Sequence, residues 1–156
     1  MNFNLSQYRI AGSLKEYKKK RDFGITPEPQ DSKPSEAKNI FLVQKHQADK
    51  AGLHFDVRLE DEGVLKSWAV RKGMPSKGEK HLAIQTEDHP LTYADFEGDI
   101  PEGNYGAGNV KIDAKSEYKT IEQTDKKWKF EVLDGKYKGI WNLINTGDKK
   151  WLLIKS

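Results

Sequence analysis

The segment Leu53-His54-Phe55-Asp56-Val57-Arg58-Leu59-Glu60 alternates apolar and polar residues without interruption. Successive side chains of a β-strand point to opposite faces, so this alternation predicts a half-buried strand over residues 53–60. The apolar residues are expected to enter the core: Leu53, Phe55, Val57 and Leu59. The polar residues line the other face, about 7 Å apart at every second position, so they can converge on one small ligand. The alternative is a solvent-facing strand, for which Thr, Lys and Ser are the more usual polar residues.

Short segments rich in β-branched and aromatic residues continue this pattern along most of the chain. They lie at residues 40–46, 64–71, 81–87, 109–114, 128–133, 139–144 and 151–155. The connections between them include three hairpin-type turns: Asp61-Glu62-Gly63, Asp134-Gly135 and Thr146-Gly147-Asp148. Many short strands joined by tight turns are typical of a mainly β, antiparallel fold, either a small barrel or a sandwich.

The N-terminal region has a different pattern. Ser13-Leu14-Lys15-Glu16 resembles a helix start, with Ser13 as the N-cap and Glu16 at the capping-box position, and predicts a short helix ending near Arg21. Three prolines between residues 24 and 39 disfavour both helix and central strand, so this segment is expected to be an extended arm. We therefore expect a single domain over residues 1–156, with the helix and arm at 1–38 and the β core at 39–156.

Composition narrows the function classes. A chain of 156 residues has room for one hydrophobic core, and a net charge of +3 from 27 basic and 24 acidic residues is too small to indicate nucleic-acid binding by itself. No segment is apolar enough to cross a bilayer and the first ten residues lack a secretory pattern, so we expect a cytoplasmic protein without membrane contact. Without cysteine, a transition metal must be held by imidazole and carboxylate, which directs attention to the four histidines.

Two of these histidines lie close to the alternating segment. His46 ends the preceding expected strand, and the turn over residues 47–52 allows the two strands to pair as a hairpin. His46 then approaches His54 and Asp56. Two imidazoles and one carboxylate leave part of an octahedral shell open for water and a phosphate oxygen on an ion such as Mn²⁺. The alternative is a trio with a purely structural role.

A third histidine, in Glu87-Asp88-His89-Pro90, opens a long glycine- and proline-rich segment over residues 88–108. Long loops in compact domains are usually functional, and an imidazole titrates near neutral pH. His89 is therefore a candidate phosphate ligand or acid–base group, which Tyr93 can join; the alternative is a loop histidine bonded to a backbone carbonyl. His81 begins a strand, where a surface role is expected. Residues 103–108 lack the Gly-Lys-Ser/Thr ending of a phosphate-binding loop and are interpreted as a turn.

Several motifs in order resemble the 3′-phosphoesterase domain of bacterial DNA ligase D and its free-standing relatives. The resemblance spans nearly the whole chain. Its motifs are Lys20-Arg21-Asp22-Phe23, Thr26-Pro27-Glu28-Pro29, Phe41-Leu42-Val43-Gln44-Lys45-His46, residues 53–60, Gly63-Val64-Leu65-Lys66-Ser67-Trp68-Ala69-Val70, Glu87-Asp88-His89-Pro90-Leu91, Phe96-Glu97-Gly98, Ile100-Pro101-Glu102-Gly103 and Trp151-Leu152-Leu153-Ile154-Lys155.

The resemblance implies a compact antiparallel β-barrel with a surface groove. It also implies removal of a 3′-terminal ribonucleoside or 3′-phosphate from a DNA strand, leaving a 3′-hydroxyl for repair synthesis or ligation. The cofactor it implies is Mn²⁺, or another divalent transition metal such as Zn²⁺ or Co²⁺. By motif position, the metal ligands are His46, His54 and Asp56. The residues that engage the scissile phosphate are Arg58, His89 and Tyr93.

Further residues carry lesser roles in the same resemblance. Arg21, Asp22 and Glu28 on the arm have supporting or substrate-contacting roles in catalysis. The residues expected to support the ligands from behind are Gln44, Ser67, Lys72 and Glu87. The chain departs from the family in two places: His46 and His54 are eight residues apart, whereas six is usual, and His81 stands where the family tends to carry arginine.

The implied partners are primer–template 3′ ends of DNA, including ends that carry a ribonucleotide. A separate ligase and a separate polymerase are further expected partners. One alternative function is a DNA-end-binding module without catalysis. Another is a phosphoesterase that acts on RNA ends or on small phosphate esters.

Overall fold

The structure is a computed structural model that describes residues 13–30 and 39–156. These residues form the strands β1 (Ile40–Ala48), β2 (Gly52–Asp61), β3 (Val64–Val70), β4 (Lys80–His89), β5 (Gly98–Ile100), β6 (Gly108–Gln123), β7 (Lys127–Val132), β8 (Gly139–Gly147) and β9 (Lys150–Lys155). A short helix, α1 (Lys15–Lys19), and a 3₁₀ helix, η2 (Leu91–Asp95), complete the described fold. Expectations for residues 1–12 and 31–38 lie outside the described residues.

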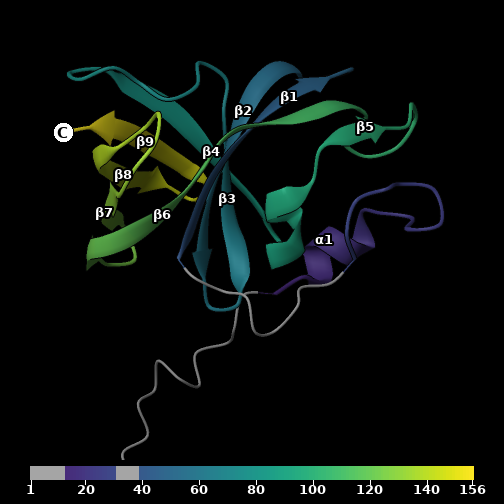
Figure 1. Ribbon diagram of the computed structural model, residues 1–156, viewed down its shortest axis with the longest axis horizontal. Coiled ribbons are helices and arrows are strands. Elements are labelled where there is room, and N and C mark those ends of the chain that lie inside the picture. Colours follow the sequence, from purple (N-terminus) through teal and green to yellow (C-terminus); the bar gives the residue numbers. More distant parts are fainter. Residues whose placement is uncertain (1–12, 31–38) are drawn as a thin grey trace, which may run out of the picture.

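The strands form an eight-stranded antiparallel barrel, which confirms the predicted mainly β class (Figure 1). The order is β1-β2-β3-β4-β9-β8-β7-β6, and β6 closes the barrel by pairing with β1. β6 is long because its first part pairs with β1 and its last part pairs with β7. β5 pairs with the start of β6 and extends the sheet beyond the closed barrel.

All eight predicted strands are present, but the long segment after residue 88 differs from the expectation. β4 continues to His89, which pairs with Leu65 of β3, so His89 ends a strand and does not lie in a loop. The expected loop contains η2 and β5. β6 runs to Gln123 although the prediction ended at residue 114, because pairing with β7 stabilises a charged segment that carries no apolar alternation of its own.

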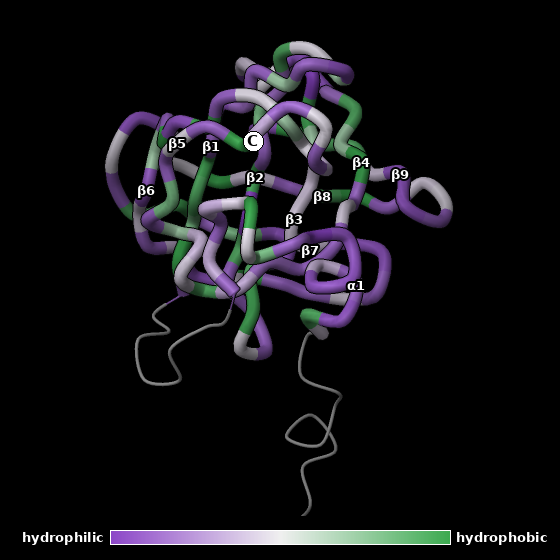
Figure 2. The backbone as a smooth tube through the Cα atoms, turned by 90° about the vertical axis from the view of Figure 1, so that its right-hand side faces the viewer, coloured by the Kyte–Doolittle hydropathy of each residue, from purple (hydrophilic) through white to green (hydrophobic). Residues whose placement is uncertain are grey.

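Apolar side chains form two clusters on opposite faces of β1–β3. The first fills the barrel and includes Val57, Trp68 and Phe130. The second lies outside the barrel, where Tyr17 of α1 and Tyr93 of η2 pack with apolar side chains from the strands. Hydrophobic and hydrophilic residues therefore succeed one another along the strands in Figure 2, whereas α1 is largely hydrophilic.

This outer cluster changes the surroundings of β2. The predicted polar face of β2 is buried, with exposed fractions of 9% for His54, 7% for Asp56 and 2% for Arg58. The core prediction is confirmed for Val57 and Leu59, whereas Leu53 is 42% exposed, because it lies at the end of the strand beside the hairpin turn. Covering elements that are distant in sequence thus decide the environment of the polar row.

The N-terminal helix forms, with a later start than predicted. Its N-cap is Leu14, which has no side-chain cap hydrogen bond, so Ser13 is not the N-cap, although its Oγ accepts a hydrogen bond from the Lys15 N–H at 3.2 Å. Glu16 pairs with Lys20 instead of completing a capping box. After the helix, Thr26 N donates to Asp22 O at 2.9 Å, which closes a turn, and the side chains of Thr26 and Glu28 are buried. The arm is thereby placed beside the polar face of β2.

Candidate metal and phosphate site

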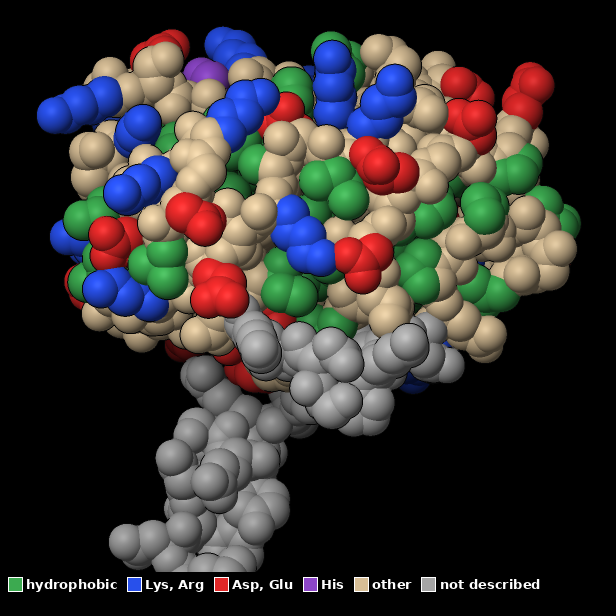
Figure 3. All heavy atoms as spheres, viewed as in Figure 1, with side chains coloured by type: hydrophobic (Ala, Val, Ile, Leu, Met, Phe, Trp, Pro, Cys, Tyr) green, Lys and Arg blue, Asp and Glu red, His purple; other side chains and the backbone are tan. Residues whose placement is uncertain are grey.

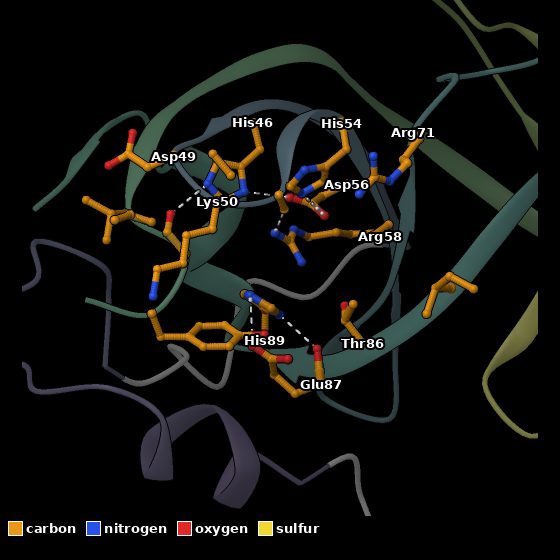
Figure 4. Close-up of a pocket in the computed structure, with 18 of the residues that line it drawn as sticks. His46, Asp49, Lys50, His54, Asp56, Arg58, Arg71, Thr86, Glu87 and His89 are labelled. Carbon is orange, nitrogen blue, oxygen red and sulfur yellow. Dashed lines mark hydrogen bonds and ion pairs between the residues drawn. The ribbon is translucent and has the colours of Figure 1, made fainter. Parts of the chain in front are cut away.

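The β1–β2 pairing brings the three predicted metal ligands together. His46 and His54 are direct partners in the antiparallel register, and their ring centroids are 4.7 Å apart. Asp56 lies two residues further along the same face, with Oδ2 at 3.5 Å from His46 Nδ1 and Oδ1 at 3.2 Å from His54 Nε2. One ligand atom from each residue lies within 4.8 Å of the others (Figure 4). A single cation therefore has access to all three side chains.

The unusual histidine spacing does not disturb this geometry. The ladder continues past the histidine pair through Gln47–Leu53 and Ala48–Gly52 before the chain turns. Adding one residue to each strand of an antiparallel hairpin preserves the pairs below it. The two extra residues therefore lengthen the hairpin beyond the site and leave His46 opposite His54.

Backbone carbonyl groups fix the tautomer of each imidazole. His46 Nε2 lies 2.7 Å from Gly106 O, and His54 Nδ1 lies 3.4 Å from Gly52 O. Because a carbonyl oxygen only accepts hydrogen bonds, these nitrogens carry the protons. The second nitrogens of the two rings, His46 Nδ1 and His54 Nε2, then face Asp56: with a proton they donate to its carboxylate, and without one they offer a lone pair to a cation. Two imidazole lone pairs and a carboxylate directed at one space form a donor set that fits a divalent transition metal.

The electrostatics of Asp56 agree with this fit. Burial alone raises the pKa of Asp56, but Arg58, followed by hydrogen bonds from His46 and His54, lowers that pKa far below its ordinary value. Burial lowers the pKa of His54, but its hydrogen bond with Asp56 and the carboxylate charge outweigh burial and raise that pKa. A proton and a metal ion therefore compete for the same imidazole nitrogen.

Arg58 lies beside the trio in a fixed orientation. Its Nε donates to Gln44 Oε1 and its NH1 donates to Ser67 Oγ, both at 2.8 Å. Its NH2 lies 3.6 Å from Asp56 Oδ2, and the guanidinium lies over the Tyr93 ring at 4.9 Å. Gln44 in turn donates from Nε2 to the carbonyl oxygens of Tyr93 and Phe96. Gln44 and Ser67 thus hold the plane of the guanidinium.

His89 lies across the cleft from the trio (Figure 4). Its Nδ1 donates to Glu87 O at 2.9 Å, so the backbone contact considered as an alternative role is present. Its Nε2 lies 3.5 Å from Arg21 NH2 and accepts from that group. Burial, followed by the charges of Arg58 and Arg21, lowers the pKa of His89 well below its ordinary value. His89 is therefore a neutral imidazole whose lone pair is on Nε2, where Arg21 contacts it.

The arm supplies a buried network behind His89. Arg21 Nε donates to Glu28 Oε2 at 2.9 Å, and Arg21 NH1 donates to Glu87 Oε1 at 3.1 Å. The Tyr93 hydroxyl donates to the same Glu28 carboxylate at 2.8 Å, so its proton is engaged within this network. Burial raises the pKa of Glu87, but Arg21 and Lys20 outweigh it and lower that pKa. The network stabilises the position of His89 from one side.

Not every predicted site residue lies in this cleft. Asp22 is exposed, and its Oδ1 accepts from the Gly24 N–H at 3.0 Å, outside the cleft. Lys72 and His81 line the cleft on the β3–β4 side, and His81 Nδ1 donates to Gly73 O at 2.6 Å. Glu60, the last polar residue of the alternating row, instead accepts a hydrogen bond from the Asn39 backbone N–H.

The sequence did not identify the contribution of residues 103–108. They form a turn as predicted, and Gly106 O is the carbonyl that holds His46. Gly108 is required by close approach, because a Cβ there would lie 2.0 Å from Gln47 O of β1. A backbone carbonyl contact depends on how β6 closes against β1, so no residue type in the sequence signals it.

The cleft as a whole has a volume of about 1240 Å³. Its lining includes the trio, Arg58 and His89, and it extends over basic side chains. These are Lys50, Arg71, Lys72 and Lys80. Lys and Arg side chains also occupy the upper half of the face in Figure 3, interspersed with Asp and Glu. Among the described residues, no helix is long and apolar enough to cross a membrane.

A family model and individual relatives point to the same protein family. The model of the DNA ligase D 3′-phosphoesterase domain matches residues 44–145. The multifunctional non-homologous end joining protein LigD of Pseudomonas aeruginosa is 46% identical in an alignment that covers 92% of this chain and 18% of that protein. The LigD proteins of Mycobacterium bovis and Mycolicibacterium smegmatis are 44% and 38% identical, over 92% of this chain and 20% of theirs.

The chain thus spans about a fifth of the length of these curated relatives. The family match covers β2, β3 and β4 with the cluster of Asp56, Arg58 and His89, and it includes His46 and His54. The family model matches more than half of the chain, and the relatives are 38–46% identical over most of it. The chain therefore belongs to the DNA ligase D 3′-phosphoesterase domain family.

Proposed function

We propose that this chain is a metal-dependent phosphoesterase that processes DNA 3′ ends, removing a 3′-terminal ribonucleoside or a 3′-phosphate to leave a 3′-hydroxyl. The observation that carries the proposal is the convergence of His46 Nδ1, His54 Nε2 and the Asp56 carboxylate beside the guanidinium of Arg58. A donor set next to a rigid cation in a cleft suits a phosphate ester. Membership of the 3′-phosphoesterase family supports the same reaction class.

The trio is proposed to hold Mn²⁺, or alternatively Zn²⁺ or Co²⁺. A bound divalent ion supplies Lewis acidity to a phosphate oxygen and lowers the pKa of a bound water. The residues contribute the ionised carboxylate of Asp56 and the two imidazole lone pairs, whose opposite nitrogens are held by Gly106 O and Gly52 O. This support orients the ligands before any ion binds.

Arg58 is the proposed anion-stabilising group. Because Gln44 and Ser67 already bind two of its donors, the guanidinium requires no reorientation when negative charge develops on the phosphate. Its 2% exposure means that few water molecules weaken its interaction with an oxyanion. Tyr93, to which the family resemblance gives a phosphate contact, is proposed to act through its ring beneath Arg58 and through Glu28.

His89 is the proposed acid–base group or phosphate ligand. As a neutral imidazole with its lone pair on Nε2, it is able to accept a proton from the reacting groups when they displace the long contact with Arg21 NH2. Arg21, Glu28 and Glu87 are proposed to position it, and Lys72 to contact the substrate from the β3–β4 side. Asp22 is proposed to act indirectly, through the turn that places the arm.

The proposed substrate is the 3′ end of a primer strand on a template. Lys50, Arg71, Lys72 and Lys80 on the cleft are proposed to contact backbone phosphates, so affinity should fall with salt. The relatives are named as multifunctional non-homologous end joining proteins. Ligase and polymerase activities are accordingly the proposed functional partners of this chain.

The test is a labelled primer–template that ends in one ribonucleotide, incubated with Mn²⁺ or with EDTA. We expect loss of the terminal nucleoside followed by loss of the phosphate, only with metal, and no product from His54→Ala. Thermal unfolding of the variant controls for folding. Binding without product would indicate an end-binding module. Faster turnover of RNA ends or of a small phosphate ester, in matched reactions, would contradict the DNA assignment.

A further inference from the structure

Tyr105 differs from the other tyrosines that line or flank the cleft. Tyr17 and Tyr93 are buried, with 0% and 2% exposure, and their hydroxyls donate within the protein. Tyr105 lies in the turn between β5 and β6, lines the same cleft as Arg58 and His89, and is 47% exposed. A large exposed aromatic ring at a cleft is available to a ligand.

Contacts with the arm hold this ring at the mouth of the cleft. Lys20 Nζ lies 4.7 Å from the centroid of the Tyr105 ring, and Arg21 Cζ lies 5.2 Å from it. Lys20 Nζ also donates to the Tyr105 hydroxyl at 3.4 Å. Cations that lie against an aromatic ring restrict its orientation, so the ring is partly ordered before a ligand arrives.

The turn that carries Tyr105 is tied to the candidate metal ligands. Gly106 O accepts the hydrogen bond from His46, and Ala107 O accepts one from the Asp49 N–H at 2.8 Å. The ring is therefore attached one residue away from the carbonyl that orients His46. A group stacked on Tyr105 lies in the same cleft as a phosphate held by Arg58.

The β1–β2 hairpin places a cation near the same mouth. Lys50 is exposed at the tip of the hairpin and points into the cleft (Figure 4). Asp49 and Glu102 line this part of the cleft as well, so its net charge is small and charge alone gives little affinity. An aromatic surface combined with basic side chains is the usual arrangement for binding nucleic-acid strands without sequence preference.

We propose that Tyr105 is the stacking surface for the nucleobase next to the scissile phosphate, and that Lys50 contacts the backbone of the same strand. This inference rests on the proposed function, because it presupposes a nucleic-acid end in the cleft. It adds a specificity-determining residue outside the cluster of His46, His54, Asp56, Arg58 and His89. By stacking on the nucleobase, Tyr105 would favour a nucleic-acid end over free phosphate or a small phosphate ester, which have no base.

The test measures binding without turnover, by fluorescence anisotropy in EDTA. Two oligonucleotides are compared, one intact and one abasic at the nucleotide next to the scissile phosphate. For the natural chain, removing the base should weaken binding about tenfold, or about 1.4 kcal/mol. For Tyr105→Ala, the intact strand should bind as weakly as the abasic one, and removing the base should cause no further loss. Tyr105→Phe keeps the ring and should retain the difference.

Two substitutions outside the cleft serve as matched controls, one near the end of β6 and one between β6 and β7. Ile121 is exposed to a similar extent, 46%, and lies outside the cleft, so Ile121→Ala should leave the base effect unchanged. Lys126→Ala, also outside the cleft, controls for the charge removed by Lys50→Ala, which should weaken both oligonucleotides equally. A full base effect in Tyr105→Ala with unchanged thermal unfolding would overturn the proposal.

Turnover with Mn²⁺ then separates this inference from the proposed function. A rise in KM for Tyr105→Ala that is confined to ribonucleotide-ended strands places the departing base on the ring. A rise that extends to 3′-phosphate ends places the retained base there, and both results support stacking. Hydrolysis with no base effect in any variant overturns stacking and leaves the proposed function intact. A base effect without hydrolysis supports stacking and overturns the proposed function.

Discussion

β2 and β7 have the same alternating sequence pattern and different surroundings. In β7, Lys129 and Glu131 alternate with the buried Trp128, Phe130 and Val132 and stay partly exposed, as the pattern predicts. In β2, the polar residues Asp56 and Arg58 are buried, and Tyr93 of η2 packs against Arg58. The pattern identifies the faces of a strand, and only the covering elements make one polar face into a site.

The largest expected difference between the two strands concerns activity. Arg58→Ala on β2 should lower kcat by roughly 10²–10³-fold, because it removes a fixed donor for the phosphate charge. Lys129→Ala on β7 removes an outward cation that lies outside the cleft and should leave kcat unchanged. Steady-state kinetics on a 3′-phosphate end provide the measurement. Equal effects of the two substitutions would contradict the role given to Arg58.

The second difference concerns stability. Arg21→Ala leaves the buried carboxylates of Glu28 and Glu87 without their main partner and should lower the free energy of unfolding by about 3–5 kcal/mol. Lys119→Ala breaks an ion pair with Glu131 whose lysine side chain is largely exposed, and should cost less than about 1 kcal/mol. Urea unfolding measures both. A small loss in Arg21→Ala would show that the arm does not depend on this network.

Metal binding at the site on β2 should stabilise the folded chain. At a Mn²⁺ concentration of about 100 times the Kd, the gain in unfolding free energy is about 2.7 kcal/mol, which raises the Tm. Asp56→Asn removes the carboxylate that faces both imidazoles and should abolish the rise. Asp113→Asn, whose carboxylate binds Lys136 and Tyr137 away from the trio, should preserve it. Differential scanning fluorimetry detects the shift, and a persistent rise in Asp56→Asn would contradict the metal assignment.

The smallest expected effect concerns acid stability. The pKa of Glu87 in the folded chain lies below its ordinary value of 4.5, so its contribution to stability is present above that value. The contribution is lost as pH falls through the folded pKa. The natural chain should therefore unfold at a higher temperature than Glu87→Gln at pH 7, and the difference should shrink as pH falls below 4.5. A constant difference across that range would show that charge is not the cause.

Much of the fold was predictable because its signals are local. The eight expected strands are present, since alternation and turn residues act over a few positions. β5, η2 and the second part of β6 were not predicted, because each forms through pairing or packing with a distant segment. Leu53 was placed in the core by alternation alone, although it lies where the strand emerges beside a turn.

The candidate site follows the same division. The approach of His46 to His54 and Asp56 was predictable, because hairpin pairing determines it. The catalytic roles of Arg58, His89, Tyr93 and the arm residues stay predictions. The neutral state of His89 and the engagement of the Tyr93 hydroxyl by Glu28 depend on contacts across the fold. Asp22 instead makes a local contact with Gly24, outside the cleft.

The amino-acid sequence by itself determined the strands, the hairpin and the chemical types of the ligands, because alternation and turn propensity are properties of neighbouring residues. Only the tertiary structure decided that the polar face of β2 is buried, that Gly106 O orients His46 and that Tyr105 stands at the cleft. These features arise where β6 closes on β1 and the arm folds over the barrel. A backbone carbonyl is the same for every residue type, and a segment that covers a strand is distant from it in sequence. The residue pattern of a strand therefore does not indicate these contacts, which form only in the folded barrel.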